Sequence, residues 1–369
     1  MKRIIKTLHR SIFLALCMLM PTLSEAKTAY EALELISVGT PIEYKNLKIY
    51  PLYHLILKNS DKVLLPHEQY KNYVTLDQAS KKGWIAIKEK GSGIVNTVTV
   101  KNNGPREVLV LSGEIISGAK QDRTVAKDIL LPAHSEWTDI PVFCVEHGRW
   151  HHVSPGFKSA NMFAPNSVRK KVLETKSQSE VWSEISSLQS KSGIQSETQT
   201  VLDNYKHSDT KNIIKEYEKH LSFYRFHSNT IGVVVTTGDR IISVEMFSTN
   251  KMLGKYWSKL IKSWTIDALY SKRSKIERHH ICDLLDAIKN ADQINVATPG
   301  LGKLFEIECP EGTGSALFVE ELLASSRHHL SSCVFPVRRL VHLNFFPSYA
   351  LAKPKLTRTI LYPPPPSIR

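Results

Sequence analysis

Seven short apolar runs between Pro41 and Cys144 constrain the fold of this chain more than any other feature. Each is three or four residues long, and turn-forming segments such as Asn102-Asn-Gly-Pro105 separate them. Short apolar runs bounded by Gly, Pro and Asn are typical of antiparallel strands. The runs are 47–50, 55–57, 84–87, 98–100, 108–111, 129–131 and 140–143. They predict an antiparallel sandwich or a curled sheet.

One helix is expected within this β-rich region. Thr75 and Gln78 have the spacing of a capping box, and Gly83 is placed to end the helix. Helical periodicity takes over beyond residue 171. It is clearest from Leu253 to Ala268, where apolar residues recur every three or four positions.

Strands return in the C-terminal part of the chain. Two apolar runs, 231–236 and 241–247, flank Thr237-Gly-Asp-Arg240, which is typical of a hairpin. Further short strands are expected near 294–296, 305–307, 316–319 and 341–343. We therefore predict an α+β fold: an N-terminal antiparallel β-rich half, followed by helices and a C-terminal α/β-type half.

The N-terminus has the pattern of a signal peptide. Four basic residues precede the apolar stretch 11–20, and Ser24-Glu25-Ala26 offers a cleavage site with small residues. This predicts a cleavable signal peptide over 1–26 and a periplasmic or secreted protein; an uncleaved anchor is the alternative. The remainder divides into a β-rich domain at 27–160, a helical and mixed α/β region at 161–350 packed with it as one unit, and a basic, Pro-rich disordered tail at 351–369.

The chain is strongly basic, with a net charge of +14 that falls to +11 without the leader, because the leader carries four Lys/Arg and one Glu. A positive field favours anionic partners, either a small molecule or an envelope polymer. No specific nucleic-acid motif accompanies the charge, and no stretch after the leader is apolar enough to cross a membrane. No cofactor or oligomeric state is indicated.

Four cysteines remain after the leader. An even number in an exported chain permits disulfides or free thiols, and the sequence leaves the pairing open. Their spacing matches no zinc site. They are Cys144, Cys282, Cys309 and Cys333.

Two neighbouring segments concentrate the polar chemistry. Residues 112–123 read Ser-Gly-Glu-Ile-Ile-Ser-Gly-Ala-Lys-Gln-Asp-Arg, and residues 140–150 read Ile-Pro-Val-Phe-Cys-Val-Glu-His-Gly-Arg-Trp. This density of carboxylates, cations and a thiol between apolar runs predicts a site. The candidate catalytic residues are Glu114, Cys144 and Glu146, and the candidate ligand-binding residues are Gly118, Lys120, Gln121, Arg123 and Arg149.

The first segment nearly forms a phosphate-binding P-loop. Ala119 intervenes before the lysine, and Gln121 replaces the hydroxyl residue that such a loop requires. A weaker prediction remains, in which Gly118 turns backbone amides toward an anion while Lys120 and Arg123 supply charge. The alternative is a tight turn with two solvated cations.

The second segment contains a candidate nucleophile, and here too two interpretations remain open. A reactive cysteine needs a lowered pKa, usually from a nearby cation, and Arg149 follows Cys144 closely. The alternative is a buried structural cysteine. His147 and His151 have metal-binding spacing only on a helix, and Gly148 argues against a helix, so no metal site is predicted.

Together these segments resemble the ARG and Rhodanese-Phosphatase-superfamily-associated protein domain, and the resemblance covers most of residues 36–346. It implies work on ADP-ribose-like or other phosphorylated ligands, because the family is associated with ADP-ribosylglycohydrolases and rhodanese-phosphatase proteins; no reaction comes with it. The leader and an apparent insertion at 318–340 depart from the family pattern. The resemblance also implies that one site is shared by Glu114, Lys120, Gln121, Arg123, Cys144, Glu146 and Arg149.

Two hypotheses follow. In the first, the chain is an exported hydrolase-like enzyme acting on a phosphate-bearing or ADP-ribosyl ligand, with Glu114 or Glu146 as general acid/base. In the second, it is a non-catalytic envelope protein that binds anionic polymers. The polar motifs would then be structural ion pairs joining these two glutamates to Arg123 and Arg149.

Overall fold

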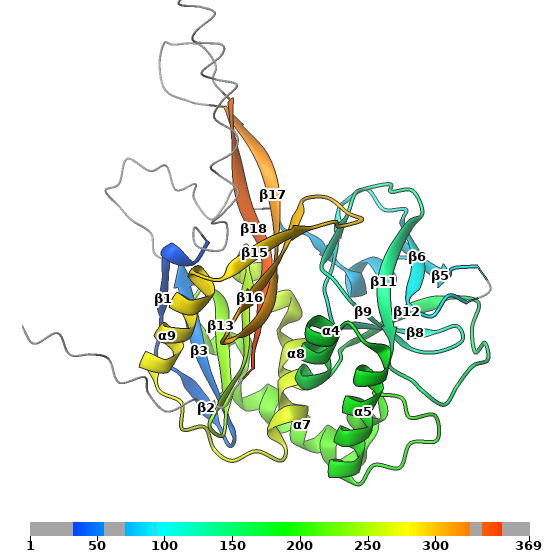
Figure 1. The fold of residues 1–369 in the computed structure, drawn as a ribbon, viewed down its shortest axis with the longest axis horizontal. Helices are drawn as coiled ribbons and strands as arrows, with labels where there is room; N and C mark the ends of the chain where they lie inside the picture. The colour runs from blue at the N-terminus through cyan, green and yellow to red at the C-terminus, as the bar shows by residue number, and fades with distance from the viewer. Residues whose placement is uncertain (1–31, 55–70, 92, 325–333, 349–369) are drawn as a thin grey trace, which may run out of the picture.

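A nine-stranded antiparallel sheet forms one side of the molecule (Figure 1). The computed structural model describes residues 32–54, 71–91, 93–324 and 334–348. The strand order is β1-β3-β13-β14-β18-β17-β16-β15, with β2 paired to β3. Its strands are β1 Ile36–Val38, β2 Ile42–Tyr44, β3 Leu47–His54, β13 Thr230–Thr237, β14 Arg240–Phe247, β15 Asp292–Val296, β16 Lys303–Cys309, β17 Gly312–Ala324 and β18 Val334–Pro347.

The predicted curled sheet closes into a six-stranded barrel with the order β11-β6-β5-β12-β8-β9. Apolar side chains such as Val98, Val125 and Val142 fill its interior, as expected for a barrel of few strands. Its strands are β5 Ile85–Glu89, β6 Thr97–Asn102, β8 Glu114–Gly118, β9 Arg123–Val125, β11 Thr138–Cys144 and β12 Phe157–Phe163.

A three-stranded sheet lies between the barrel and the rest of the molecule. It consists of β10 Ile129–Leu131, β7 Val108–Val110 and β4 Val74–Thr75, in that order. Val108 and Val110 pack into the barrel core, whereas Leu109 belongs to the central core on the other side. Because neighbouring side chains in a strand point to opposite faces, this thin sheet joins two apolar cores.

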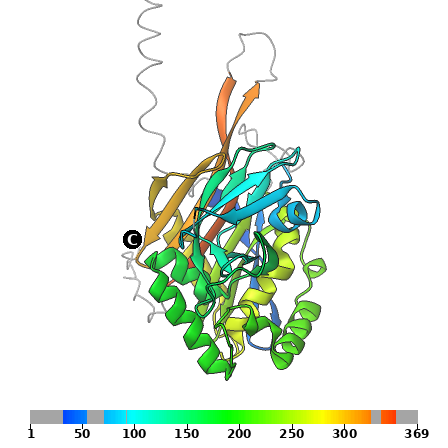
Figure 2. The same ribbon diagram turned by 90° about the vertical axis from the view of Figure 1, so that its right-hand side faces the viewer.

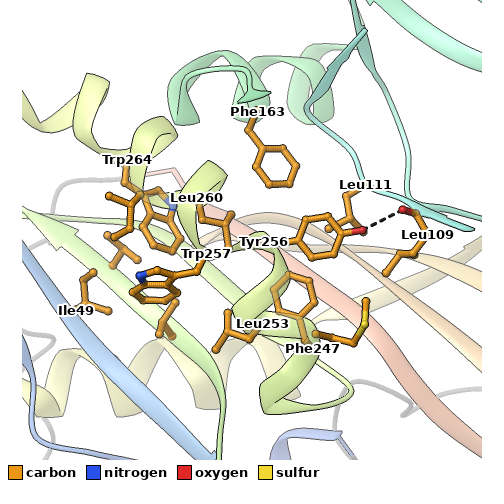
Figure 3. Close-up of a cluster of buried hydrophobic side chains, with 14 of the residues drawn as sticks. Ile49, Leu109, Leu111, Phe163, Phe247, Leu253, Tyr256, Trp257, Leu260 and Trp264 are labelled. Atoms are coloured by element: carbon orange, nitrogen blue, oxygen red, sulfur yellow. Dashed lines mark hydrogen bonds between the residues drawn. The ribbon is translucent and has the colours of Figure 1, made fainter. Parts of the chain in front are cut away.

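The helices cover both faces of the large sheet and the outer wall of the barrel. Helix α8 lies between sheet and barrel, and its aromatic residues Tyr256, Trp257 and Trp264 form the centre of the largest core (Figures 1 and 3). Helix α9 packs on the opposite face of the sheet. The helices are α3 Leu76–Lys81, α4 Asn166–Thr175, α5 Gln178–Ser192, α6 Asp203–Lys206, α7 Ser208–His220, the 3-10 turn η2 Phe223–Arg225, α8 Asn250–Ala268 and α9 Arg278–Lys289.

The α+β fold class predicted from the sequence is confirmed. Thr75 and Gln78 form the capping box of α3, and β13 and β14 form the expected hairpin through the Thr237–Arg240 pair. The region from Leu253 to Ala268 lies within one helix. None of the helices in the described ranges is long and apolar enough to cross a membrane.

The first strands of the chain join the C-terminal sheet, since β3 pairs with β13 across about 180 residues of sequence. Strands β17 and β18 form a long hairpin that projects beyond the rest of the described chain (Figure 2). The segment expected to be an insertion lies on this hairpin, and residues 325–333 are outside the described ranges. So are the predicted leader at 1–26, the strand expected at 55–57 and the tail at 351–369.

Candidate functional site

The two glycines of the first motif, Gly113 and Gly118, bracket β8, and the turn from β8 to β9 follows Gly118. Gly113 and Gly118 have φ angles of 89° and 126°, a region that favours glycine. A Cβ atom on Gly118 would lie 2.6 Å from the carbonyl oxygen of Gly156, so the turn needs glycine for space as well as for conformation. The two glycines therefore fix the path of the backbone that carries the polar residues.

Strand alternation places Arg123 and Cys144 inside the barrel. Arg123 stands two residues before Val125, and Cys144 two residues after Val142, and both valines belong to the barrel core. Side chains two positions apart in a strand share a face. Arg123 and Cys144 are also direct partners in the β9–β11 register. They lie together at one end of the barrel.

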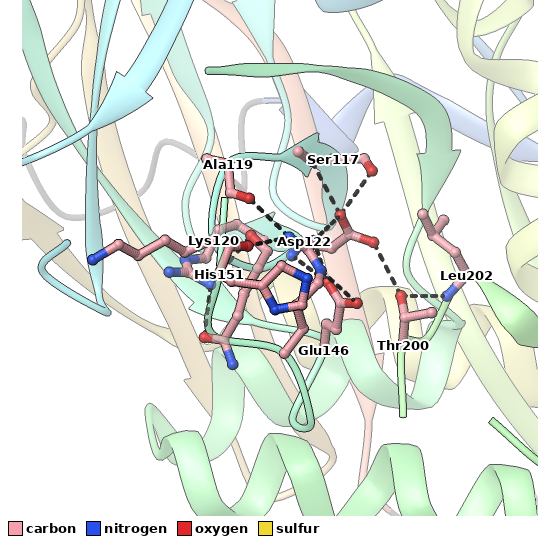
Figure 4. Close-up of polar contacts among 12 residues, drawn as sticks. Ser117, Ala119, Lys120, Asp122, Glu146, His151, Thr200 and Leu202 are labelled. Atoms are coloured by element: carbon pink, nitrogen blue, oxygen red, sulfur yellow. Dashed lines mark hydrogen bonds and ion pairs between the residues drawn. The ribbon is translucent and has the colours of Figure 1, made fainter. Parts of the chain in front are cut away.

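Glu146 and Arg149 form a paired network with Asp122 (Figure 4). Arg149 donates from Nε to Glu146 Oε1 at 2.9 Å and from Nη2 to Oε2 at 2.5 Å, which is a bidentate pair. The Asp122 amide donates to Glu146 Oε2 at 2.9 Å, and Arg149 Nη1 donates to the Ala119 carbonyl at 2.8 Å. All three side chains are buried. The network therefore joins the two motifs through charge-assisted hydrogen bonds.

Asp122 belongs to this network but was not among the candidate residues predicted from the sequence. Its carboxylate accepts from Ser117 Oγ at 2.7 Å, from the Gly118 amide at 3.1 Å and from Thr200 Oγ1 at 3.0 Å. In the sequence, Asp122 could have been identified from its position between the two candidates Gln121 and Arg123. Its partner Thr200 is 78 residues away, and nothing in the sequence near Thr200 indicates this contact.

Arg123 is fully buried but only partly bonded. Its Nη1 donates to Gln121 Oε1 at 3.1 Å, and its Nη2 lies 3.7 Å from Glu89 Oε1. The Nε and Nη2 atoms form no hydrogen bond within the described ranges, and neither does Glu89 Oε2. Gln121, Arg123 and Cys144 thus share this barrel end with Glu89.

The thiol of Cys144 is poorly suited to be a nucleophile. Burial raises its pKa to about 11, although the nearby charge of Arg123 acts in the opposite direction. Burial also raises the pKa of Glu146, but the hydrogen bonds from Arg149 and from the Asp122 amide outweigh it, so this pKa is lowered. Glu146 is therefore an ionised ion-pair partner at neutral pH, with no proton to give.

Glu114 belongs to a different cluster. Its side chain pairs with Lys259 of α8, which also pairs with Asp77 of α3. Its Oε2 accepts from the Leu111 amide at 2.8 Å. Burial raises the pKa of Glu114 to about 7 despite the charge of Lys259. The cluster is sealed, since Glu114 is 1% exposed and Lys259 is 3% exposed.

A second buried cluster joins the first motif to the large sheet. His342 Nδ1 lies 2.6 Å from Asp128, and its Nε2 lies 3.0 Å from Glu245. Arg169 Nη1 lies 2.7 Å from Glu245. The Ser112 amide donates to Asp128 at 2.8 Å, one residue after the amide that binds Glu114. None of these four charged residues was among the candidates predicted from the sequence; they come from four distant parts of the chain.

The remaining candidates lie at the surface near the barrel end. The Lys120 ammonium lies 5.0 Å from the centre of the Trp150 ring, which is half exposed. His147 contacts Gln199 at 3.1 Å. No group of three or more metal-binding side chains occurs among the described residues. Cys144, Cys282 and Cys309 are free thiols, and Cys333 lies outside the described ranges.

Comparison with known proteins identifies the family. The family model of the ARG and Rhodanese-Phosphatase-superfamily-associated Protein domain matches residues 35–346, which is most of the chain. The chain belongs to this family. A search of curated proteins and a search of solved structures found no match. Both polar motifs and all the contacts described above lie within the matched residues.

Proposed function

We propose that this family member is an exported, non-catalytic binding protein for anionic, phosphate-bearing ligands. In this proposal the two motifs build the frame of the protein and do not react. The observation that carries it is the Asp122–Glu146–Arg149 network, whose charged groups are buried and bonded to one another. A catalytic carboxylate or guanidinium must be able to reach its substrate.

The choice of ligand rests on charge and on the family association. The net charge of +11 that remains without the leader attracts anions over long range. The family's name links it to proteins of the rhodanese-phosphatase superfamily, which supports a ligand that carries phosphate. Export rests on the N-terminal pattern, and mass spectrometry of the N-terminus of the mature protein tests it: cleavage after Ala26 is the expected result.

Incubation of the purified protein with ADP-ribose, NAD and an ADP-ribosylated peptide tests the absence of catalysis. The expected result is no turnover of any of the three. Calorimetric binding to ADP-ribose or to an anionic polymer should be measurable and should weaken as salt is raised. Turnover that survives purification and is lost in a variant of the motifs would overturn the proposal.

The enzyme hypothesis has one observation in its favour, the carboxyl group of Glu114. With a pKa of about 7, it can exchange a proton near neutral pH. If it acts as a general acid/base, Glu114→Gln should abolish turnover while the melting temperature changes little. If it is an ion-pair partner, Glu114→Gln should alter the melting temperature and leave no activity to lose.

A further inference from the structure

A pocket between η2 and the start of α8 has the chemistry of a ligand site. Its volume is about 480 Å³, and its lining includes Phe223, Tyr224 and Trp257 together with Lys251 and Lys255. The floor is rigid, because Trp257 Nε1 donates to the Leu221 carbonyl at 2.8 Å and its ring packs 5.3 Å from that of Phe223. The pocket thus combines aromatic faces with cations, which suits a ring that carries negative charge.

Gly254 allows the Phe223 ring to lie directly on α8. A Cβ atom at this position would come within 2.8 Å of that ring. Tyr224, the next residue, is 97% exposed, although it sits in the middle of an ordered 3-10 turn. Leaving a large aromatic ring in water forgoes the stabilisation that burial would give. Its exposure beside the pocket is explained if it covers a ligand.

Two cations line this pocket and a third lies near them. Lys251 and Lys255 are lining residues in the first two turns of α8, and Arg106, just before β7, is close enough for its charge to lower the pKa of Lys255. Lys255 donates from Nζ to the Tyr73 carbonyl and Arg106 from Nη2 to the Asn72 carbonyl, but no ion pair of these three cations is found among the described residues. The nearest carboxylate in the sequence, Glu107, is paired with Lys71 at 3.4 Å.

Glu218, the carboxylate among the lining residues, is also engaged. It accepts from Ser258 at 2.6 Å and lies 3.8 Å from Lys262. Burial and the positive charges of Arg106 and Lys251 lower the pKa of Lys255 to about 8. Like charges held this close are unfavourable unless an anion joins them.

We propose that this pocket binds a phosphate group attached to a planar ring. The phosphate lies between Lys251 and Lys255, with Arg106 adding positive potential, and the ring lies against Phe223 and Tyr224. Lysine ammonium groups bind phosphate oxygens through charge-assisted hydrogen bonds, and aromatic rings stack on planar ligands. This inference rests on the proposed function and gives it a location.

Calorimetric titration of the full chain with three probes tests the inference. Adenosine monophosphate carries both ring and phosphate, adenosine carries the ring alone, and inorganic phosphate carries the phosphate alone. Adenosine monophosphate should bind most tightly. Lys251→Gln should weaken its binding, and that of inorganic phosphate, about tenfold, which corresponds to about 1.4 kcal/mol.

Tyr224→Ala separates the ring from the charge. This variant should weaken the binding of adenosine monophosphate about tenfold, because the stacking contact is lost, and leave the binding of inorganic phosphate unchanged. Because Tyr224 is almost fully exposed, this variant should fold normally. Lys191→Gln, which removes an exposed lysine at the end of α5, is the matched control and should change nothing.

The outcomes distinguish the pocket from the general function. Equal weakening by Lys191→Gln would mean that only net charge matters, and the pocket would be refuted. Binding of adenosine monophosphate that no pocket variant alters would also refute the pocket, while anion binding by the protein would stand. If neither this nucleotide nor an anionic polymer binds, the proposed function itself fails.

Discussion

At the residue scale, the polar side chains of the two motifs separate into two groups. Arg123 and Cys144 lie within the barrel end, whereas Glu146 and Arg149 bind Asp122. Ion pairs and hydrogen bonds of this kind offset most of the free energy that is lost when charged groups are buried. The consequence is that removing one partner should harm stability more than chemistry.

Glu146→Ala should destabilise the fold by about 3 kcal/mol, because it leaves Arg149 buried without its bidentate partner. Urea denaturation followed by circular dichroism measures this. The control is Glu197→Ala, since Glu197 is exposed and should tolerate the change. Adding Arg149→Met to the first variant should restore part of the loss. If Glu146→Ala left the free energy of unfolding unchanged, the structural role of this residue would be contradicted.

Cys144 should resist alkylation, because its thiol is buried and its pKa is raised to about 11. Treatment with iodoacetamide at pH 8 should modify the exposed Cys282 first. Peptide mass spectrometry over time measures the order. Cys144 should react at a comparable rate only after denaturation. Rapid modification of Cys144 in the folded protein would instead revive its role as a nucleophile.

At the scale of elements, the ion pairs of Lys259 connect helix α8 to helix α3 and to strand β8 of the barrel. Lys259 pairs with Asp77 on α3 and with Glu114 on β8, and the rings of Tyr256 and Phe163 lie 4.7 and 5.2 Å from its ammonium. A single buried cation thus serves two carboxylates. Without Lys259, both carboxylates would be buried with no cation beside them.

Lys259→Met should therefore destabilise the protein by about 3 to 5 kcal/mol at neutral pH. The loss should be smaller near pH 4, well below the raised pKa of Glu114, because that carboxyl group is then protonated and no longer needs a cation. Urea denaturation of the variant and the wild type at the two pH values measures the difference. A loss that is equal at both pH values would mean that packing, rather than charge, accounts for it.

Local elements were predictable from sequence, and distant pairings were not. The β13–β14 hairpin, the α3 capping box and α8 depend on residues close together in the chain, so turn chemistry and periodicity revealed them. Closure of the barrel and the β3–β13 pairing depend on contacts between distant strands. Short apolar runs look the same in an open sheet and in a barrel, so the sequence left that choice open.

The candidate site was predictable only in part, for the same reason. Glu146 and Arg149 are three residues apart, and their pairing follows from proximity. Glu114 was expected to share their site, but its partner Lys259 is 145 residues away on a helix whose other lysines face solvent or pockets. Lys259 is not one of the recurring apolar positions of that helix, yet tertiary packing buries it.

At the scale of the whole molecule, His342 joins the large sheet to the segment that connects β9 of the barrel to β10 of the small sheet. It lies between Asp128 and Glu245, and all three are fully buried. Burial lowers the pKa of His342, but the two carboxylates outweigh this and raise it to about 9. The folded protein therefore holds a proton there that the unfolded chain, with an ordinary histidine pKa near 6.5, releases.

This linkage fixes how stability should depend on pH. The contribution of His342 is fully present below about pH 6.5 and is lost as the pH rises through about 9, because the folded state binds more protons over that range. His342→Gln cannot hold the proton, so the gap in melting temperature between wild type and this variant should narrow from pH 6 to pH 9.5. Thermal denaturation across this range measures the gap. A gap that stays constant would show that His342 is neutral in the folded protein, and the three parts of the molecule would then be joined by packing and ordinary hydrogen bonds rather than by a buried charge.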